Sequence, residues 1–334
     1  MTGPVTPPRL PHSPDDGTVD AVLEKLELTV RLKLDGLLQG NYLGLVPGSG
    51  SEPGEARQYY PGDDVRRMDW PVTARTTVPH VRETIADREL ETWVVVDLSP
   101  SLDFGTARCE KRDLAVAALA AIVYLTQHGG NRIGTLTTTG EQVVRSAALS
   151  GRAHAQHLIR QVVRTPRSAS GRRGDLAAAV EMLRRPPRRR GLVVVISDFL
   201  GEYGGAGPGV GVDRPAGFDW SAGFDWERPM RAMGVRHEVL AVEVLDPREL
   251  SMPALGLLTL VDPETGQQVE VQTSDADLRA RYAAAAAAQR AAIGGALRRA
   301  DAAHLRLSTD RDWLLDIVRF VAARRRGVSG GALR

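Results

Sequence analysis

Two apolar segments stand out in the pattern of hydrophobic and polar positions along the chain. Residues 92–98 and 191–196 are rich in valine, leucine and isoleucine. Runs of this kind are typical of strands that are buried on both faces of a parallel sheet. Further strands are predicted over residues 132–138, 142–148, 238–244 and 304–307, and over a hairpin of 256–261 and 268–272.

Between these strands, apolar residues recur at helical spacing. They predict helices over residues 18–39, 106–128, 152–164, 175–184, 275–302 and 312–323. Thr106 is the expected N-cap of the second helix. Because strands alternate with helices, the predicted fold class is α/β, with a Rossmann-like, doubly wound and mostly parallel sheet preceded by an N-terminal helix.

Three regions are expected along the chain. Residues 1–17 are rich in proline and polar residues and are expected to form a disordered tail. Residues 18–90 contain the N-terminal helix, a glycine-rich and loop-like stretch over 41–57, and a turn at Pro61-Gly62. Residues 91–325 are expected to form the α/β domain with its C-terminal helices.

Composition narrows the function classes. The chain has 334 residues, with 43 Lys+Arg against 41 Asp+Glu, so a net charge of +2 does not favour nucleic-acid binding. The single cysteine, Cys109, excludes an internal disulfide. The longest apolar run, over 114–125, is shorter than the ~20 residues that a membrane span needs. The N-terminus lacks the apolar core of a signal peptide, so we expect a cytoplasmic protein.

Polar residues that can bind a metal follow both apolar strands. Asp97, Ser99 and Ser101 alternate at the end of the first strand, and Asp198 ends the second. In open α/β sheets, ligands bind beyond the carboxyl ends of the strands, where such residues meet. Carboxylate and hydroxyl oxygens are hard ligands suited to Mg²⁺ or Mn²⁺. The sequence therefore predicts a divalent-cation site with one coordination position open to a carboxylate of an acidic protein ligand.

Two motifs of this chain resemble motifs of known families. Asp97-Leu98-Ser99-Pro100-Ser101 resembles the Asp-x-Ser-x-Ser motif of von Willebrand factor A domains. Upstream, residues 60–70 and the pair Ala74-Arg75 resemble the signature of the bacterial family called domain of unknown function 58. The resemblance covers roughly residues 40–245. The signature residues that are candidates for a structural or partner-binding role are Asp63, Asp64, Arg66, Asp69, Trp70 and Arg75.

This resemblance implies an A-type domain with a metal-dependent adhesion site, and a MoxR-type AAA+ ATPase as partner. The chain would then act as an adaptor or substrate recogniser, which is an argument by family analogy. A-type domains usually supply a threonine between the two strands, and here Gly174 stands before Asp175-Leu176, where that threonine is expected. The candidates to replace it are Asp175, Thr165, Ser168 and Ser170.

A non-catalytic role is favoured over an enzymatic one. The alternative is a metal-dependent, phosphatase-like hydrolase that uses Asp97 and Asp198. Phosphatases of the haloacid dehalogenase type place a second acid two residues after the nucleophile, and Ser99 stands at that position.

A separate feature is the sequence Ala-Gly-Phe-Asp-Trp, which occurs at 216–220 and again at 222–226. It is interpreted as a loop expansion, with an exposed aromatic patch for a partner as the alternative.

Overall fold

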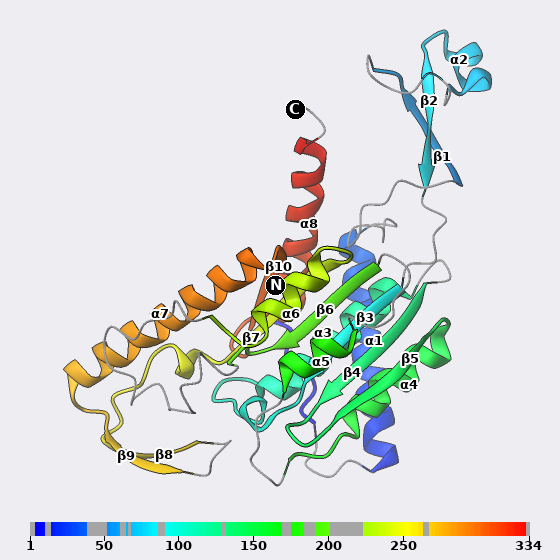
Figure 1. Cartoon of the computed structure of the whole chain (residues 1–334). Coiled ribbons are helices and arrows are strands. Elements are labelled where there is room, and N and C mark those ends of the chain that lie inside the picture. The colour runs from blue at the N-terminus through cyan, green and yellow to red at the C-terminus, as the bar shows by residue number, and fades with distance from the viewer. Residues whose placement is uncertain are drawn as a thin grey trace.

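The computed structural model describes residues 4–10, 15–38, 52–60, 65, 68–85, 91–127, 131–168, 175–183, 191–200, 223–262 and 267–331. Within these residues, a six-stranded sheet lies between two layers of helices (Figure 1). Its strands are β3 (Glu91–Asp97), β4 (Arg132–Thr138), β5 (Val143–Leu149), β6 (Gly191–Ser197), β7 (Glu238–Leu245) and β10 (Ala302–Ser308).

The strand order of this sheet is β10-β7-β6-β3-β4-β5, and every neighbouring pair is parallel except β4 and β5. The predicted Rossmann-like, mostly parallel α/β fold is therefore confirmed. The chain places β4 on one side of β3 and later returns to place β6 on the other side. This reversal makes the carboxyl ends of β3 and β6 the switch point, where ligand sites form in sheets of this kind.

The alternating side chains of the central strands build two cores, one on each face of the sheet. Val94 and Val96 of β3 pack in the first core, together with residues of α1 (Asp16–Leu38), α3 (Lys111–Thr126), α4 (Arg152–Val163) and α8 (Trp313–Gly331). Trp93 and Val95 of the same strand pack in the second core. The helices of that second core are α5 (Leu176–Leu183), α6 (Glu227–Gly234) and α7 (Ala276–Arg299).

The N-terminal residues are part of the first core. Leu10 is buried, its N–H donates to Asp113 Oδ1 at 2.7 Å, and Val5 N–H donates to Asp312 Oδ2 at 3.0 Å. Residues 4–10 thus differ from the disordered tail that their composition predicts, because one leucine and two backbone donors tie them to α3 and the start of α8. Residues 11–14 lie outside the described residues.

A separate two-stranded sheet follows α1. It pairs β1 (Glu52–Gln58) with β2 (His80–Ile85) in antiparallel fashion, and α2 (Trp70–Thr76) lies between them in the sequence. In Figure 1 this sheet stands apart from the six-stranded sheet. The loop-like interpretation of 41–57 missed β1, because glycine and proline within Glu52–Gln58 hide the strand pattern.

A second hairpin, β8 (Leu257–Val261) with β9 (Gln268–Gln272), agrees with the predicted one. The helix expected from Thr106 begins later, at Lys111, because Glu110 and Asp113 form its capping box. Among the described helices, none has an apolar stretch long enough to cross a bilayer.

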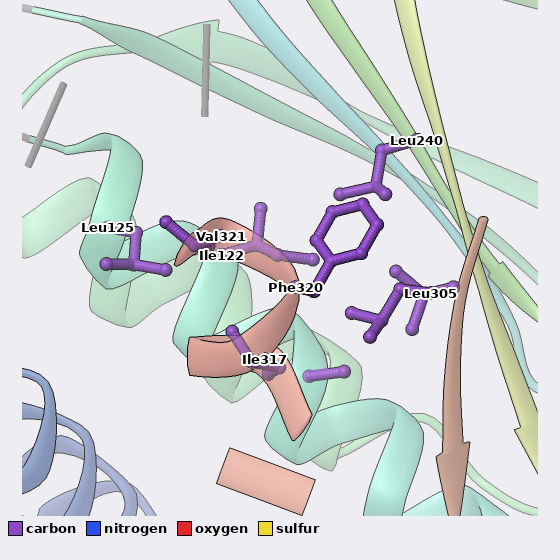
Figure 2. A pocket seen from close by; sticks show the side chains of 9 residues that line it. Ile122, Leu125, Leu240, Leu305, Ile317, Phe320 and Val321 are labelled. Atoms are coloured by element: carbon purple, nitrogen blue, oxygen red, sulfur yellow. The ribbon is translucent and has the colours of Figure 1, made fainter. Parts of the chain in front are cut away.

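One small cavity lies between α3, α8 and the sheet (Figure 2). Its volume is ≈ 10 Å³, and all nine lining side chains, among them Phe320, Leu240 and Leu305, are apolar. A cavity of this size has room for about one water molecule and no polar group to hold it. It is a packing gap, and the chemistry of the chain lies elsewhere.

Candidate functional site

The first polar group of the site is built by the turn that follows β3. Ser99 N–H donates to Asp97 Oδ1 at 2.9 Å, and the Oγ atoms of Ser99 and Ser101 are 3.1 Å apart. A single 3-10 turn, Pro100–Leu102, brings Ser101 back beside Ser99. All three polar residues are buried, with Asp97 only 4% exposed.

The end of β6 supplies the second polar group. Ser197 Oγ donates to Asp97 Oδ2 at 2.7 Å, and Asp198 accepts a hydrogen bond from Ser101 and another from Leu200 N–H at 3.2 Å. Asp198 is 2% exposed. The structure thus brings together Asp97, Ser99, Ser101 and Asp198, the four residues that the sequence predicts as ligands. We call these four residues the Asp–Ser cluster.

The backbone after Asp198 is unusual. Phe199 has a φ of 57°, in the left-handed region that bulky residues rarely adopt. Its ring is fully buried and lies edge-on against Trp226, with 5.2 Å between ring centroids, and its N–H donates to Ser197 Oγ at 3.0 Å. These contacts hold the turn that places Asp198 beside the other residues of the cluster.

A lysine that sequence analysis did not single out lies against this cluster. Lys111 is the first residue of α3 and is fully buried. Its Nζ donates to Asp198 Oδ2 at 2.9 Å and to Glu249 Oε1 at 2.5 Å. Glu249 follows β7, and its other oxygen accepts a hydrogen bond from Asp246 N–H at 3.0 Å. The ammonium group therefore bridges the ends of β6 and β7.

These charges shift the acidity of the buried groups. Burial and the nearby Asp198 raise the pKa of Asp97 to about 6. Burial acts to raise the pKa of Asp198 as well, but the ammonium of Lys111 outweighs it and lowers that pKa. For Lys111, burial favours the neutral amine, but the two carboxylates raise its pKa and keep it charged. The site thus holds a resident cation with Asp198 as its ionised partner.

An arginine next to Lys111 holds the surrounding loops. Arg112 Nε pairs with Asp103 Oδ1 at 2.7 Å, and its Nη atoms donate to the carbonyls of Leu98 and Thr165 at 3.3 and 2.9 Å. Arg112 is buried, so these contacts replace the water that the guanidinium loses on folding. The loop after β3 and the loop after α4 are joined through this one side chain.

The residues considered as a replacement for the expected threonine lie in other contacts. Thr165 Oγ1 donates to Gln161 O at 3.0 Å, back into α4. Asp175 Oδ1 accepts from Ala178 N–H at 2.6 Å at the start of α5, and Ser168 Oγ donates to Glu141 at 3.2 Å. Ser170 and Gly174 lie outside the described residues.

The Asp–Ser cluster has the chemistry of a Mg²⁺ site, but an ammonium group is already paired with one of its two acids. Lys111 Nζ occupies one oxygen of Asp198, and Ser197 and Ser99 donate to both oxygens of Asp97. None of the buried polar atoms of these residues lacks a hydrogen-bond partner within the described part of the chain. In the same part of the chain, no three His, Cys, Asp or Glu side chains gather to hold a metal. The residues present therefore fit an ammonium group better than a divalent cation.

The signature residues upstream are only partly described, since Asp63, Asp64 and Arg66 lie outside the described residues. Asp69 is buried and caps α2 by accepting from Val72 N–H at 3.2 Å. Trp70 is 67% exposed at the start of this helix, and Arg75 lies in its last turn.

The duplicated pentapeptide can be followed in its second copy. Phe224 and Trp226 are buried in the second core and stack on each other, with 4.9 Å between ring centroids. The alternative of an exposed aromatic patch is therefore wrong for this copy, because both of its rings are buried in the second core. The first copy, over 216–220, lies outside the described residues.

The family model described as "Protein of unknown function DUF58" matches residues 55–292. An uncharacterized protein of Mycobacterium tuberculosis is 55% identical over 317 residues, which cover 95% of this chain and 93% of that protein. An uncharacterized protein of Mycobacterium avium is 47% identical over 189 residues, or 57% of this chain and 99% of that protein.

Among solved structures, the conserved hypothetical protein BatB from Bacteroides thetaiotaomicron is similar with a TM-score of 0.38 and 13% identity, covering 71% of this chain and 99% of that chain. A von Willebrand factor type A structure from Catenulispora acidiphila has a TM-score of 0.30 and 13% identity, covering 50% of this chain and 35% of that chain. Since the family model spans more than half of the sequence, this chain belongs to the family described as protein of unknown function DUF58.

Proposed function

We propose that this chain is a non-catalytic protein-interaction module that binds its partner with the face at the carboxyl ends of β3, β6 and β7. The partner proposed from the family resemblance is a MoxR-type AAA+ ATPase, for which the chain would be an adaptor or substrate recogniser. A cytoplasmic location is part of this proposal, because such an ATPase needs a supply of ATP.

The observation that carries the non-catalytic role is the internal pairing of the Asp–Ser cluster. A nucleophile or general acid must offer an oxygen to the substrate within hydrogen-bond reach. Both oxygens of Asp97 accept internal hydrogen bonds, Asp198 pairs with Lys111, and both acids are almost completely buried. The cluster therefore supports the shape of the face and offers little to a reacting molecule.

Exposed apolar side chains beside the cluster support a binding role. Phe104, which is 38% exposed, lies in the loop that leads from β3 to α3, and its carbonyl accepts from Lys111 N–H at 2.8 Å. Leu250, which is 37% exposed, follows Glu249 directly. Aromatic residues on a rigid support are enriched at the centres of protein interfaces. Phe104 and Leu250 are thus candidate contacts next to the residues of this buried ion pair.

The test is capture of the purified MoxR-type ATPase from the same genome by the immobilised full chain. Replacing the exposed ring in Phe104→Asp is expected to weaken retention by about tenfold or more, as for a central interface residue. The matched control is Val235→Asp. Val235 is 77% exposed and lies just before the amino end of β7, away from the carboxyl ends that form the proposed face. Equal retention of both variants and the wild type would contradict the proposed face.

The same preparation tests the alternative of a phosphatase-like hydrolase. We expect no turnover of a generic phosphomonoester, with or without added Mg²⁺. Turnover that disappears in Asp97→Asn would show that the cluster is catalytic and would replace the proposal of an adaptor.

A further inference from the structure

Lys111 lies where an ordinary lysine is costly. It is fully buried, and it is the first residue of α3, at the helix end where the dipole disfavours a positive charge. The two acids at this helix end, Glu110 and Asp113, form the capping box with backbone N–H groups, and neither is a partner of Lys111 Nζ in the contacts described above. A charge in such a place persists only when carboxylates compensate for the water that it loses.

The two carboxylates that compensate for it come from distant parts of the chain. Asp198 follows β6, Glu249 follows β7, and both lie within hydrogen-bond distance of Nζ. Glu249 is held in turn by Asp246 N–H, and Arg290 Nη2 lies 3.8 Å from its Oε2. The ammonium group is therefore fixed from both sides at the switch point of the sheet.

A divalent cation in the Asp–Ser cluster would have to share Asp198 with this ammonium. Like charges that share one buried carboxylate repel each other strongly, since the surroundings screen them poorly. Nor does an oxygen of Asp97 remain without a donor. Binding of a divalent cation at Asp198 would therefore require the Lys111–Asp198 pair to separate or shift.

We propose that the ε-ammonium of Lys111 takes the place of a divalent cation in the Asp–Ser cluster, so that this chain keeps its binding face in shape without Mg²⁺ or Mn²⁺. The part of this proposal that concerns partner binding rests on the proposed function. The part that concerns Lys111 and the cluster is independent of that function, and metal ions alone test it.

The first measurement is thermal unfolding and calorimetric titration of the full chain with MgCl₂ or MnCl₂ against EDTA. For the wild type we expect no binding heat and a Tm that changes by less than about 1 °C between millimolar metal and EDTA. Wild-type binding that is lost in Asp97→Ala would overturn the proposal. This result is decisive even if variants of Lys111 do not fold.

The second measurement removes the ammonium. In Lys111→Ala, Asp198 and Glu249 lose the ammonium group that pairs with both of them. We expect a lower Tm in EDTA and a recovery by about 5 °C or more in saturating Mg²⁺. The matched control is Lys25→Ala, at an exposed position of α1. Its Tm should equal that of the wild type in EDTA and should not rise in Mg²⁺. The double variant Lys111→Ala with Asp198→Ala should also lose the response to Mg²⁺. A folded Lys111→Ala protein that ignores both metal ions would overturn the proposal, because lysine would then not be what excludes them.

Failure of this proposal can be told apart from failure of the proposed function. In the capture assay with nucleotide-free ATPase, the wild type is expected to retain its partner in EDTA as well as in Mg²⁺. If the partner is retained in Mg²⁺ but not in EDTA, the role of Lys111 is contradicted. No retention under either condition would contradict the adaptor role and leave the metal titrations to decide about Lys111.

Discussion

At the scale of single residues, buried carboxylates are held by the cations that the fold brings to them. Glu243 of β7 is fully buried. Its Oε1 accepts from Arg290 at 3.0 Å, and its Oε2 contacts His304 at 2.7 Å and Arg306 at 2.9 Å. Burial acts to raise the pKa of Glu243, but these partners outweigh it and lower that pKa. The acid is therefore expected to stabilise the fold in its charged form.

The variant Glu243→Gln tests this directly. Removing one partner from a buried charge cluster leaves the remaining cations uncompensated, and we expect a loss of about 3–5 kcal/mol at pH 7. The measurement is chemical unfolding of both proteins. Glu270→Gln, at an exposed position of β9, is the matched control and should change stability by less than about 0.5 kcal/mol.

The pH dependence of the same variant follows from the direction of the pKa shift. Because the pKa of Glu243 is lower in the folded state than in the unfolded state, the unfolded chain binds the extra proton as the pH falls. The advantage of the wild type over Glu243→Gln should therefore be complete above about pH 5 and shrink as the pH falls below about 4. A difference that grows on acidification would show that the carboxylate is not stabilised by its partners.

At the scale of elements, the close approach of β3 and β6 is what places Asp97 beside Asp198. Gly191 begins β6 opposite Glu91, and a Cβ added to it would lie 2.0 Å from the carbonyl oxygen of Glu91. That neighbour is backbone and cannot move aside without separating the strands. Glycine is required here for space, since its φ is not in the left-handed region.

We expect Gly191→Ala to destabilise the protein by about 1–3 kcal/mol, as overpacking of a core does. The same change at Gly17, in the first turn of α1, meets nothing nearer than 4.0 Å and should be neutral or slightly stabilising. Thermal unfolding of the two variants compares them. If Gly191→Ala unfolds at the wild-type temperature, the strands are less closely packed than described.

At the scale of the whole molecule, α1 is part of the central body, even though β1, α2 and β2 separate it from the strands in the sequence. Val19, Val22, Leu23, Leu26 and Val30 lie in the first core. Glu27 of the same helix pairs with Arg152 at 2.7 Å. The α/β domain therefore depends on a helix that precedes it by more than fifty residues.

Two leucines of α1 test this dependence. Leu26 is 1% exposed and Leu28 is 57% exposed. Leu26→Ala is expected to cost about 2–5 kcal/mol through the cavity that it leaves, and Leu28→Ala less than about 0.5 kcal/mol. Denaturant unfolding should also show a single transition for both. A small effect of Leu26→Ala would mean that α1 can leave the body without unfolding it.

Much of the fold could be predicted, because its signals are local. The apolar runs that end in Asp97 and Ser197 define β3 and β6, and their acids follow from where strands of a parallel sheet end. Strand β1 and the start of α3 at Lys111 were missed, since glycine, proline and a charged capping box obscure the pattern at those points.

The sequence by itself determined the alternation of strands and helices and the Asp–Ser cluster at one edge of the sheet. Only the tertiary structure decided what compensates the charge of that cluster. Lys111 is 87 positions from Asp198 in the sequence and 138 positions from Glu249. A lysine in the first turn of a helix resembles a surface residue, and nothing local indicates that the chain will bury it between two acids. Periodicity reports on neighbours in sequence, whereas the partner of a buried charge is chosen by how distant elements pack.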